Sequence, residues 1–275
     1  MKSLITRTIT GIIFVGIIVA TFFLPPVFYS IIFLPITLLG VWEYLQIAGK
    51  KNVTPQYLLP FLISIVVFIA FQQMQNTMSL SLVLFMIAIV LMVSLPVVEL
   101  FRKKENPTLN IAVSLFPLLW ITMPFSIAGL WFQDSASVVL SLFIIIWLND
   151  SLAYCAGSLL GKHKLFERIS PKKSWEGFLA ALILTATASA FFIDIPYFQN
   201  SVFTERWHWF GFTMLVIIAG TFGDLVESLF KRDSSVKDSG NILPGHGGIL
   251  DRFDSFLLAA PVGFAYWKII ELLCL

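Results

Sequence analysis

Apolar residues occur along this chain in long blocks separated by short polar breaks, and the block length predicts the fold. A helix needs about 20 mostly apolar residues to cross a bilayer. By that measure the chain contains roughly nine membrane-crossing segments. They are residues 8–24, 28–46, 56–73, 78–98, 109–131, 136–160, 176–193, 208–230 and 254–274. We therefore expect an all-α, polytopic membrane protein.

The breaks between these segments carry residues that interrupt helices. Pro25 and Pro26 follow the first segment, and Asn106 and Pro107 precede the fifth. Proline lacks an N–H donor and disfavours helix in the residue before it. No small-residue cleavage site precedes Pro25, so we expect the first segment to be a retained helix rather than a removed signal peptide.

The composition agrees with a membrane protein and limits its partners. Only 12% of the 275 residues are charged, whereas soluble domains usually carry about 25%. The formal net charge of +2 is too small to suggest nucleic-acid binding, so membrane lipids are the expected surroundings. The two cysteines, Cys155 and Cys274, fall in segments expected to end at opposite membrane faces. We expect no disulfide between them.

The distribution of lysine and arginine predicts the orientation. Sixteen of the 18 basic residues fall on one side of the predicted helices, while Arg206 lies on the other side and Lys268 lies inside the last helix. Basic residues that flank short loops are retained in the cytoplasm. We therefore place the N-terminus and the loops 161–175 and 231–253 on the cytoplasmic side of the cell's inner membrane. The C-terminus is then expected outside.

The most polar part of the chain runs from Ser228 to Asp254 and contains eight charged residues, a histidine and four glycines. Because it lies between two apolar segments, its charges must sit at a membrane surface or in a wet cavity. This concentration of charge indicates a membrane-bound enzyme. We expect about four N-terminal transmembrane helices in residues 1–108 and a catalytic transmembrane region in residues 109–275.

Acidic residues within the apolar segments are the first candidates for chemistry, because such groups are rare in hydrocarbon. Asp224 and Glu227 are three residues apart on one helix face, and Asp251 and Asp254 repeat that spacing. If the last two helices form an antiparallel pair, Asp224 and Asp251 can converge, and carboxylates from two helices suit Mg²⁺. Asp150 is a further acid at a helix end, and it shares a helix face with Gly157, whose small size permits close approach by another helix or a ligand. The alternative, left open, is that these acids form salt bridges or cap helices.

The loop between the last two helices has the composition of a phosphate site. Its glycines let backbone N–H groups approach a phosphate closely, and basic residues surround them. His246 could hydrogen-bond a phosphate or carry a proton, although a lone histidine in a turn is more often structural. Glycine-rich connections between helices are also common, so the composition alone does not decide. The residues of this expected cradle are Lys231, Arg232, Lys237, Gly245, His246, Gly247, Gly248 and Arg252.

The second charged loop combines five basic residues with an interfacial tryptophan, Trp175. Lys172 and Lys173 are placed to receive a lipid phosphate, and Ser174 is a candidate N-cap for the helix that follows. The alternative is a membrane-surface anchor in which the lysines meet anionic headgroups. Such an anchor would also suit an enzyme with a lipid substrate.

The segment SLFKRDSSVKDSGNILPGHGGILDRFD resembles the signature of the phosphatidate cytidylyltransferases of bacterial type, also called CDP-diacylglycerol synthases. A second stretch, from Asp150 to Gly177, is similar to another region of that family. The first four helices carry little that is diagnostic. The signature positions that match are Ser228, Lys231, Arg232, Lys237, Asp238, Gly240, Pro244, His246, Gly247, Gly248, Asp251, Arg252 and Asp254.

The resemblance implies transfer of CMP from CTP to phosphatidic acid, giving CDP-diacylglycerol and pyrophosphate in phospholipid biosynthesis. It also implies a homodimer that requires Mg²⁺, with K⁺ as a second cation, and it assigns the metal to Asp224 and Asp251. We expect Asp224, Asp251, Asp254, Lys231 and Arg232 to be catalytic. The expected substrate-binding residues are Asp150, Lys172, Lys173, Lys237, Asp238, Gly245, His246, Gly247, Gly248 and Arg252.

Two other functions fit some of these features. A transporter would also place acids within helices, but here the acids lie near one membrane face, and inverted repeats are not evident. A lipid or polyprenol kinase would use a similar arrangement of metal and phosphate. The label of CTP that enters lipid distinguishes these possibilities, since an α-phosphate label indicates cytidylyl transfer and a γ-phosphate label indicates a kinase.

Overall fold

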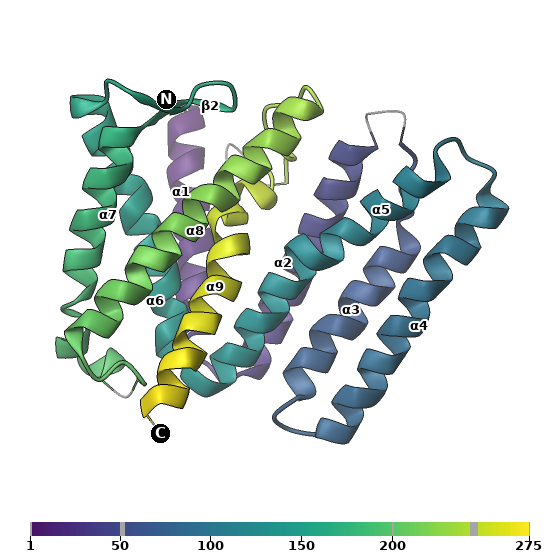
Figure 1. Cartoon of the computed structure of the whole chain (residues 1–275), viewed down its shortest axis with the longest axis horizontal. Coiled ribbons are helices and arrows are strands. Elements are labelled where there is room, and N and C mark those ends of the chain that lie inside the picture. Colours follow the sequence, from purple (N-terminus) through teal and green to yellow (C-terminus); the bar gives the residue numbers. More distant parts are fainter. Residues whose placement is uncertain (1, 50–52, 200, 243–246, 275) are drawn as a thin grey trace. The chain divides into compact units, whose positions relative to one another are not determined.

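A computed structural model describes residues 2–49, 53–199, 201–242 and 247–274, without the side chains of residues 2–7 and 274. Figure 1 shows a chain built almost entirely of helices. The long helices are α1 (Lys2–Thr21), α2 (Val27–Ala48), α3 (Leu58–Gln73), α4 (Met78–Arg102), α5 (Pro107–Pro117), α6 (Met123–Leu160), α7 (Trp175–Ser189), α8 (Arg206–Asp233) and α9 (Leu250–Cys274).

The shorter elements join these helices. A π-helical turn, η1 (Leu118–Thr122), connects α5 to α6, and two 3₁₀ turns, η2 (Phe192–Asp194) and η3 (Pro196–Phe198), follow α7. Between α6 and α7 lies an antiparallel hairpin of β1 (Lys164–Phe166) and β2 (Ser170–Ser174), in which Lys164 pairs with Ser174. The all-α prediction is therefore confirmed except for this hairpin, which falls in the predicted loop 161–175.

Six helical runs of the described chain are long and apolar enough to cross a membrane: Val27–Ala48, Met78–Arg102, Pro107–Leu160, Trp175–Asp194, Arg206–Asp233 and Leu250–Leu273. Two further apolar helices, Thr8–Thr21 and Leu58–Gln73, are shorter. The run Pro107–Leu160 includes two segments that the sequence predicted separately, and its backbone leaves helical geometry at Ser135. The predicted count of nine crossings is therefore not confirmed, and the orientation remains a prediction.

The chain divides into two compact units. The first contains residues 1–133 and 230–253, and the second contains residues 134–229 and 254–275. The first unit therefore includes the four N-terminal helices and also the loop between α8 and α9. The predicted boundary at residue 108 remains a prediction.

In the first unit, α3 and α4 pack along their length (Figure 1). Ile63 and Val67 of α3 contact Leu95 of α4 in a buried apolar cluster. The outer face of α4 exposes apolar side chains such as Val90, as expected for a helix in contact with lipid. Near the end of α4, the buried Glu99 accepts hydrogen bonds from Gln56, Asn110 and Arg102 at 2.7–2.8 Å.

In the second unit, glycines let helices approach closely. A side chain at Gly177 of α7 would lie 2.9 Å from Gly157 Cα of α6, so the predicted close approach at Gly157 is confirmed. A side chain at Gly223 of α8 would lie 2.6 Å from the carbonyl oxygen of Asp254 in α9. Gly211, nearer the start of α8, faces Tyr266, nearer the end of α9. Between these two contacts the residue number falls along α8 and rises along α9. The two helices are therefore antiparallel, as predicted.

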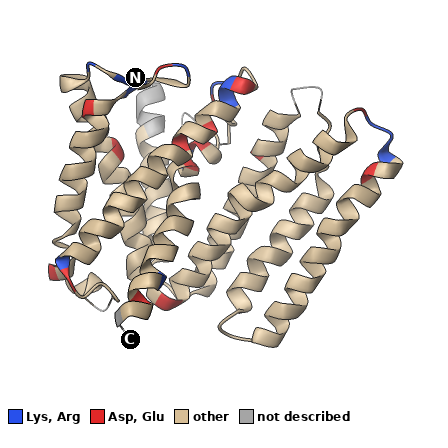
Figure 2. Cartoon of the chain, viewed as in Figure 1, with Lys and Arg blue, Asp and Glu red and all other residues tan. Residues whose placement is uncertain are grey.

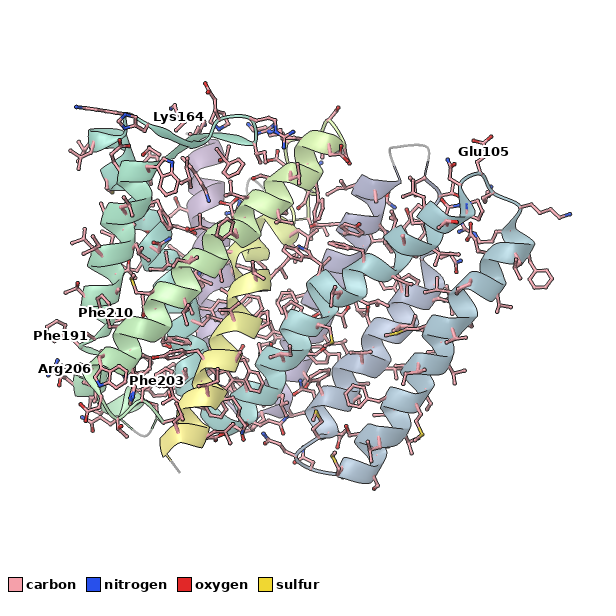
Figure 3. The ribbon with its side chains drawn as sticks, viewed as in Figure 1. Glu105, Lys164, Phe191, Phe203, Arg206 and Phe210 are labelled. Atoms are coloured by element: carbon pink, nitrogen blue, oxygen red, sulfur yellow. The ribbon has the colours of Figure 1, made fainter. Side chains whose placement is uncertain are left out.

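Charged groups gather at both ends of the second unit (Figure 2). Figure 3 shows Lys164 of the hairpin at one end and Arg206, at the start of α8, at the other. Arg206 forms an ion pair of 2.9 Å with Asp194, and its guanidinium lies 5.0 Å from the centre of the Phe191 ring. The unit therefore presents its basic hairpin and Arg206 at opposite ends, as the predicted orientation requires.

Candidate active site

In the first unit, the loop that connects α8 to α9 folds around the carboxylate of Asp251. We call the described residues of this connection, 234–242 and 247–249, the signature loop. Asp251 Oδ2 accepts hydrogen bonds from the backbone N–H of Ser239 and of Gly248, both at 2.9 Å, and lies 3.0 Å from the Ser239 hydroxyl oxygen. Asp251 Oδ1 lies 2.7 Å from Lys231 Nζ, and both side chains are largely buried. A negatively charged side chain thus organises the loop that the sequence assigned to phosphate binding.

The glycines of the signature loop are explained by this packing. Gly247 has a φ of +85°, a conformation that side-chain-bearing residues rarely adopt. A Cβ atom at Gly248 would meet the Ser239 hydroxyl and the carboxylate of Glu43, and one at Gly240 would also meet Glu43. Glycine at these positions therefore allows the loop to lie directly on two carboxylates.

Glu43 of α2 is the residue of this site that the sequence analysis missed. It is 2% exposed and accepts hydrogen bonds from the N–H of Ile249 and of Leu250, both at 2.9 Å, and from the Ser239 hydroxyl at 3.0 Å. Glu43 could have been found from the sequence, because it is an acid within an apolar segment. That is the criterion that selected the other acids.

Other residues that the sequence assigned to this site are exposed, unlike the largely buried Lys231 and Asp251. The side chains of Arg232, Lys237, Asp238 and Arg252 are exposed. This exposure keeps them accessible to a polyphosphate, as the predicted cradle requires. Gly245 and His246 lie outside the described residues, as does Pro244.

In the second unit, four acids from three helices influence one another. The carboxylates of Asp224 and Glu227 in α8 and of Asp150 in α6 are near enough for their charges to act on the carboxylate of Asp254 in α9. Asp224 also accepts a hydrogen bond of 3.2 Å from Ser228 Oγ, which confirms that these two residues share a helix face. The structure therefore brings together four of the acids that the sequence selected.

One lysine of the hairpin joins this group. The ammonium of Lys173 in β2 forms an ion pair with the carboxylate of Asp224. Lys172 is exposed, so the two predicted lysines differ in their surroundings. Lys173 belongs to the acidic cluster, whereas Lys172 remains accessible to a lipid phosphate.

The hairpin is held at its base by Glu176 in the first turn of α7. Its carboxylate accepts hydrogen bonds from the backbone N–H of Lys162 at 3.1 Å and of His163 at 3.2 Å, and it lies 2.6 Å from His163 Nδ1. Ser174 Oγ accepts a hydrogen bond from the N–H of Gly177, so the predicted N-cap is confirmed. These bonds fix the strand that carries Lys172 and Lys173.

The donor chemistry of the acids suits a hard cation, because carboxylate oxygens are the ligands that such an ion prefers and four carboxylates are neighbours in the second unit. Their geometry is less complete: within the described part of the chain, no three His, Cys, Asp or Glu side chains converge closely enough to hold a metal ion. Both oxygens of Asp251 are engaged by protein donors. Asp224 and Asp251 belong to different units, so their convergence remains a prediction.

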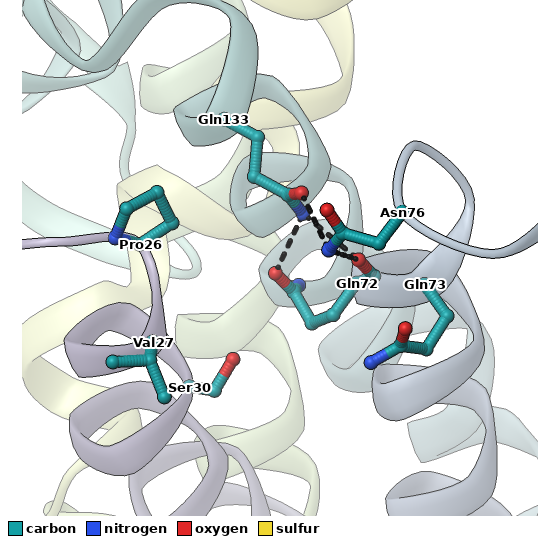
Figure 4. A pocket seen from close by; sticks show the side chains of 7 residues that line it. All are labelled: Pro26, Val27, Ser30, Gln72, Gln73, Asn76 and Gln133. Atoms are coloured by element: carbon teal, nitrogen blue, oxygen red, sulfur yellow. Dashed lines mark hydrogen bonds between the residues drawn. The ribbon is translucent and has the colours of Figure 1, made fainter.

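Two pockets of the first unit do not carry comparable chemistry. One has a volume of about 160 Å³ and is lined by neutral groups, including Gln72, Asn76 and Gln133, which bond to one another (Figure 4). A larger pocket of about 360 Å³ is mostly apolar, with Asp233 and Ser234 at its polar side. Neither contains a basic residue that could hold a phosphate.

A comparison with known proteins now decides the family. The sequence model of the cytidylyltransferase family matches residues 5–270. The chain belongs to the cytidylyltransferase family. Within that family, a phosphatidate cytidylyltransferase of Haemophilus influenzae is 32% identical over 289 aligned positions, covering 95% of this chain and 97% of the relative.

Shorter but more similar alignments point in the same direction. Phosphatidate cytidylyltransferases of Staphylococcus aureus and Staphylococcus haemolyticus are 46% and 47% identical over 133 residues. Each alignment covers 47% of this chain and 48% of the relative, so these matches span about half the length of the relatives.

Proposed function

We propose that this protein is a phosphatidate cytidylyltransferase, which transfers CMP from CTP to phosphatidic acid and releases pyrophosphate. The observation that carries the proposal is the signature loop, folded onto Asp251 and Lys231 in a chain of the cytidylyltransferase family. The relative that aligns over 95% of the chain bears the name of this activity. A lipid acceptor also suits a protein with helices long and apolar enough to cross a membrane, as this chain has.

The reaction needs no protein nucleophile, because the acceptor is already an anion. An oxygen of the phosphatidic acid phosphate forms a bond to the α-phosphorus of CTP, and the bond from that phosphorus to the bridging oxygen breaks. Pyrophosphate leaves with the electron pair. The protein must therefore position two polyanions that repel each other and stabilise the charge on the leaving group.

Basic side chains of the first unit would bind the triphosphate. Lys231, Arg232, Lys237 and Arg252 surround the signature loop, and glycines such as Gly247 bring its backbone close to a ligand. Gly245, His246 and Asp238 are assigned to the same binding role by the family signature. In the second unit, Lys172 is exposed on the hairpin and would receive the lipid phosphate.

The carboxylates would hold the cations. We assign Mg²⁺ to Asp224 and Asp251, and Asp254, Glu227 and Asp150 would orient water or a second cation, K⁺. Bound Mg²⁺ would neutralise charge on the phosphates of CTP. The lysine partners, Lys173 for Asp224 and Lys231 for Asp251, balance the charge of these acids in the protein as described. With a cation held by these carboxylates, Lys173 and Lys231 would be available to bind phosphate.

The location of the reaction follows from the charge distribution. We place the hairpin and the signature loop at the cytoplasmic face of a bacterial inner membrane, where CTP is available, and the acyl chains of the substrate in the bilayer. The family resemblance supports a homodimer. The concentration of Lys and Arg on the two loops supports the orientation.

Membranes containing the protein can be incubated with phosphatidic acid, Mg²⁺ and CTP labelled at either the α- or the γ-phosphate. We expect the α-label in lipid and the γ-label in pyrophosphate. Entry of the γ-label into lipid would instead establish a lipid kinase, and no label in lipid would favour a transporter.

A further inference from the structure

A buried acid of the N-terminal helices holds the signature loop in place. Glu43 and Gly40 are three residues apart in α2, so they share one helix face. Gly40 lets Leu250 of α9 pack against that face, since a Cβ atom there would lie 3.2 Å from the Leu250 side chain. The same face of α2 therefore meets the point where the signature loop ends and α9 begins.

The carboxylate of Glu43 accepts hydrogen bonds both from that junction and from the signature loop itself. Ile249 and Leu250 each donate a backbone N–H at 2.9 Å, one to each carboxylate oxygen, and the Ser239 hydroxyl donates at 3.0 Å. These donors lie 196 to 207 residues away in the sequence. Burying a carboxylate is costly unless its oxygens are hydrogen-bonded, so the loop and Glu43 stabilise each other.

Ser239 connects Glu43 to Asp251. Its hydroxyl oxygen lies 3.0 Å from Glu43 Oε2 and 3.0 Å from Asp251 Oδ2, and it accepts the N–H of Asp251 at 3.3 Å. A hydroxyl carries one proton, so it can donate to only one of these carboxylates at a time. If the carboxylate of Asp251 binds another partner, the Ser239 hydroxyl can donate its proton to Glu43. The loop then remains bonded to α2.

We propose that Glu43 is a positioning residue that fixes the signature loop and, through Ser239, sets the position of Asp251. It acts on CTP through the loop and does not touch the reacting atoms. The expected effect of Glu43 on the kinetics with CTP rests on the proposed function. Its expected effect on the structure of the loop does not depend on that function.

The test uses the full-length protein in detergent or lipid nanodiscs. Glu43→Gln keeps the size of the side chain but replaces one acceptor oxygen by an NH₂ group that must face a loop donor. Glu99→Gln is the matched control, because Glu99 is also a buried acid of the first unit and is bonded instead to Gln56, Arg102 and Asn110. Hydrogen exchange of residues 247–253 and the kinetics with CTP and phosphatidic acid are measured for both variants.

We expect Glu43→Gln to speed exchange of the Ile249 and Leu250 amides at least tenfold and to lower kcat/KM for CTP at least tenfold, while KM for phosphatidic acid changes less than twofold. Glu99→Gln should leave exchange at these amides unchanged. A variant that is only less stable would show similar kinetic changes with CTP and with phosphatidic acid. Equal exchange in the two variants, or faster exchange with unchanged CTP kinetics, would overturn the proposal.

Ser239 provides a second variant in case Glu43→Gln does not fold. Ser239→Ala removes the hydroxyl that bridges the two carboxylates, whereas Ser239→Thr retains it. We expect faster exchange and weaker use of CTP in the alanine variant, with recovery to within threefold of wild type in the threonine variant. Equal behaviour of the two variants would count against the link through Ser239. If the wild-type protein transfers no α-label, the proposed function fails, and the exchange measurements alone decide the role of Glu43.

Discussion

The ammonium of Lys231, near the end of α8, lies 2.7 Å from Asp251 Oδ1 in the first turn of α9, and the side chains are only 13% and 8% exposed. Twenty residues separate them, so this ion pair closes the signature loop at its base. Its burial has an energetic consequence, because removing one member leaves a charge with little access to water.

We therefore expect Lys231→Met to destabilise the protein more than Lys173→Met does. The first change leaves the buried Asp251 without its ammonium, at a cost of about 3 kcal/mol. The pair of Lys173 and Asp224 is more exposed, at 31% and 23%, and its loss should cost about 1 kcal/mol or less. Thermal unfolding of the two purified variants measures the difference. An equal fall in Tm in the two variants would show that the more buried ion pair contributes no more to stability than the more exposed one.

Asp224→Asn and Asp251→Asn should each reduce cytidylyl transfer at least a hundredfold while the protein remains folded in the membrane. The amide retains the size of the carboxylate but loses the charge that attracts a cation. Transfer of α-labelled CMP and the elution profile in detergent are the two measurements. Near-normal turnover by both purified variants would refute the assignment of these acids to the metal.

Gly248→Ala should destabilise the signature loop, because the added methyl group would meet the Ser239 hydroxyl and both carboxylate oxygens of Glu43. Such overpacking typically costs about 1–3 kcal/mol. Gly16→Ala in α1 is the matched control, since a Cβ atom there would have no atom within 4 Å. Trypsin digestion is expected to cleave at Lys237 faster in Gly248→Ala and at the wild-type rate in Gly16→Ala.

Glu176→Ala should loosen the hairpin between α6 and α7. The change removes the acceptor for the N–H groups of Lys162 and His163 and the partner of the His163 ring. We expect faster tryptic cleavage after Lys162 and Lys164, together with a higher KM for phosphatidic acid. Glu167→Ala, a change at an exposed position within the same hairpin, should leave both measurements at their wild-type values.

The orientation can be tested at the two ends of the second unit. In a background with Cys155 and Cys274 replaced by serine, a cysteine at Lys164 should be shielded from a membrane-impermeant thiol reagent added to intact cells. A cysteine at Arg206 should react, because Figure 3 places the two positions at opposite ends. The reverse pattern would invert the predicted topology.

The sequence predicted the features that depend on local pattern. Apolar block length located the helices, the small side chain of Gly157 indicated a close helix contact, and Ser174 was identified as an N-cap from the residues around it. The antiparallel pairing of α8 and α9 was the condition for the predicted approach of their acids, and the contacts of Gly211 and Gly223 confirm it. Each of these inferences uses residues near one another in the chain.

The features that were missed depend on distant contacts. Glu43 bonds to residues about 200 positions away, and nothing near it in α2 indicates those partners. The hydrogen bonds around Asp251 were also not predicted, because they require the backbone path of the loop rather than its composition. The number of crossings was not settled either, since α3, at 16 residues, is shorter than the usual span.

The distance in sequence between Glu43 and its donors has a consequence for biosynthesis. The ribosome delivers α2 to the membrane early, whereas Ser239, Ile249 and Leu250 emerge near the end of translation. During that interval the acid of α2 must remain in contact with water or with the insertion machinery. A nascent chain that stops before residue 239 therefore carries an acidic group that lacks these three hydrogen-bond donors.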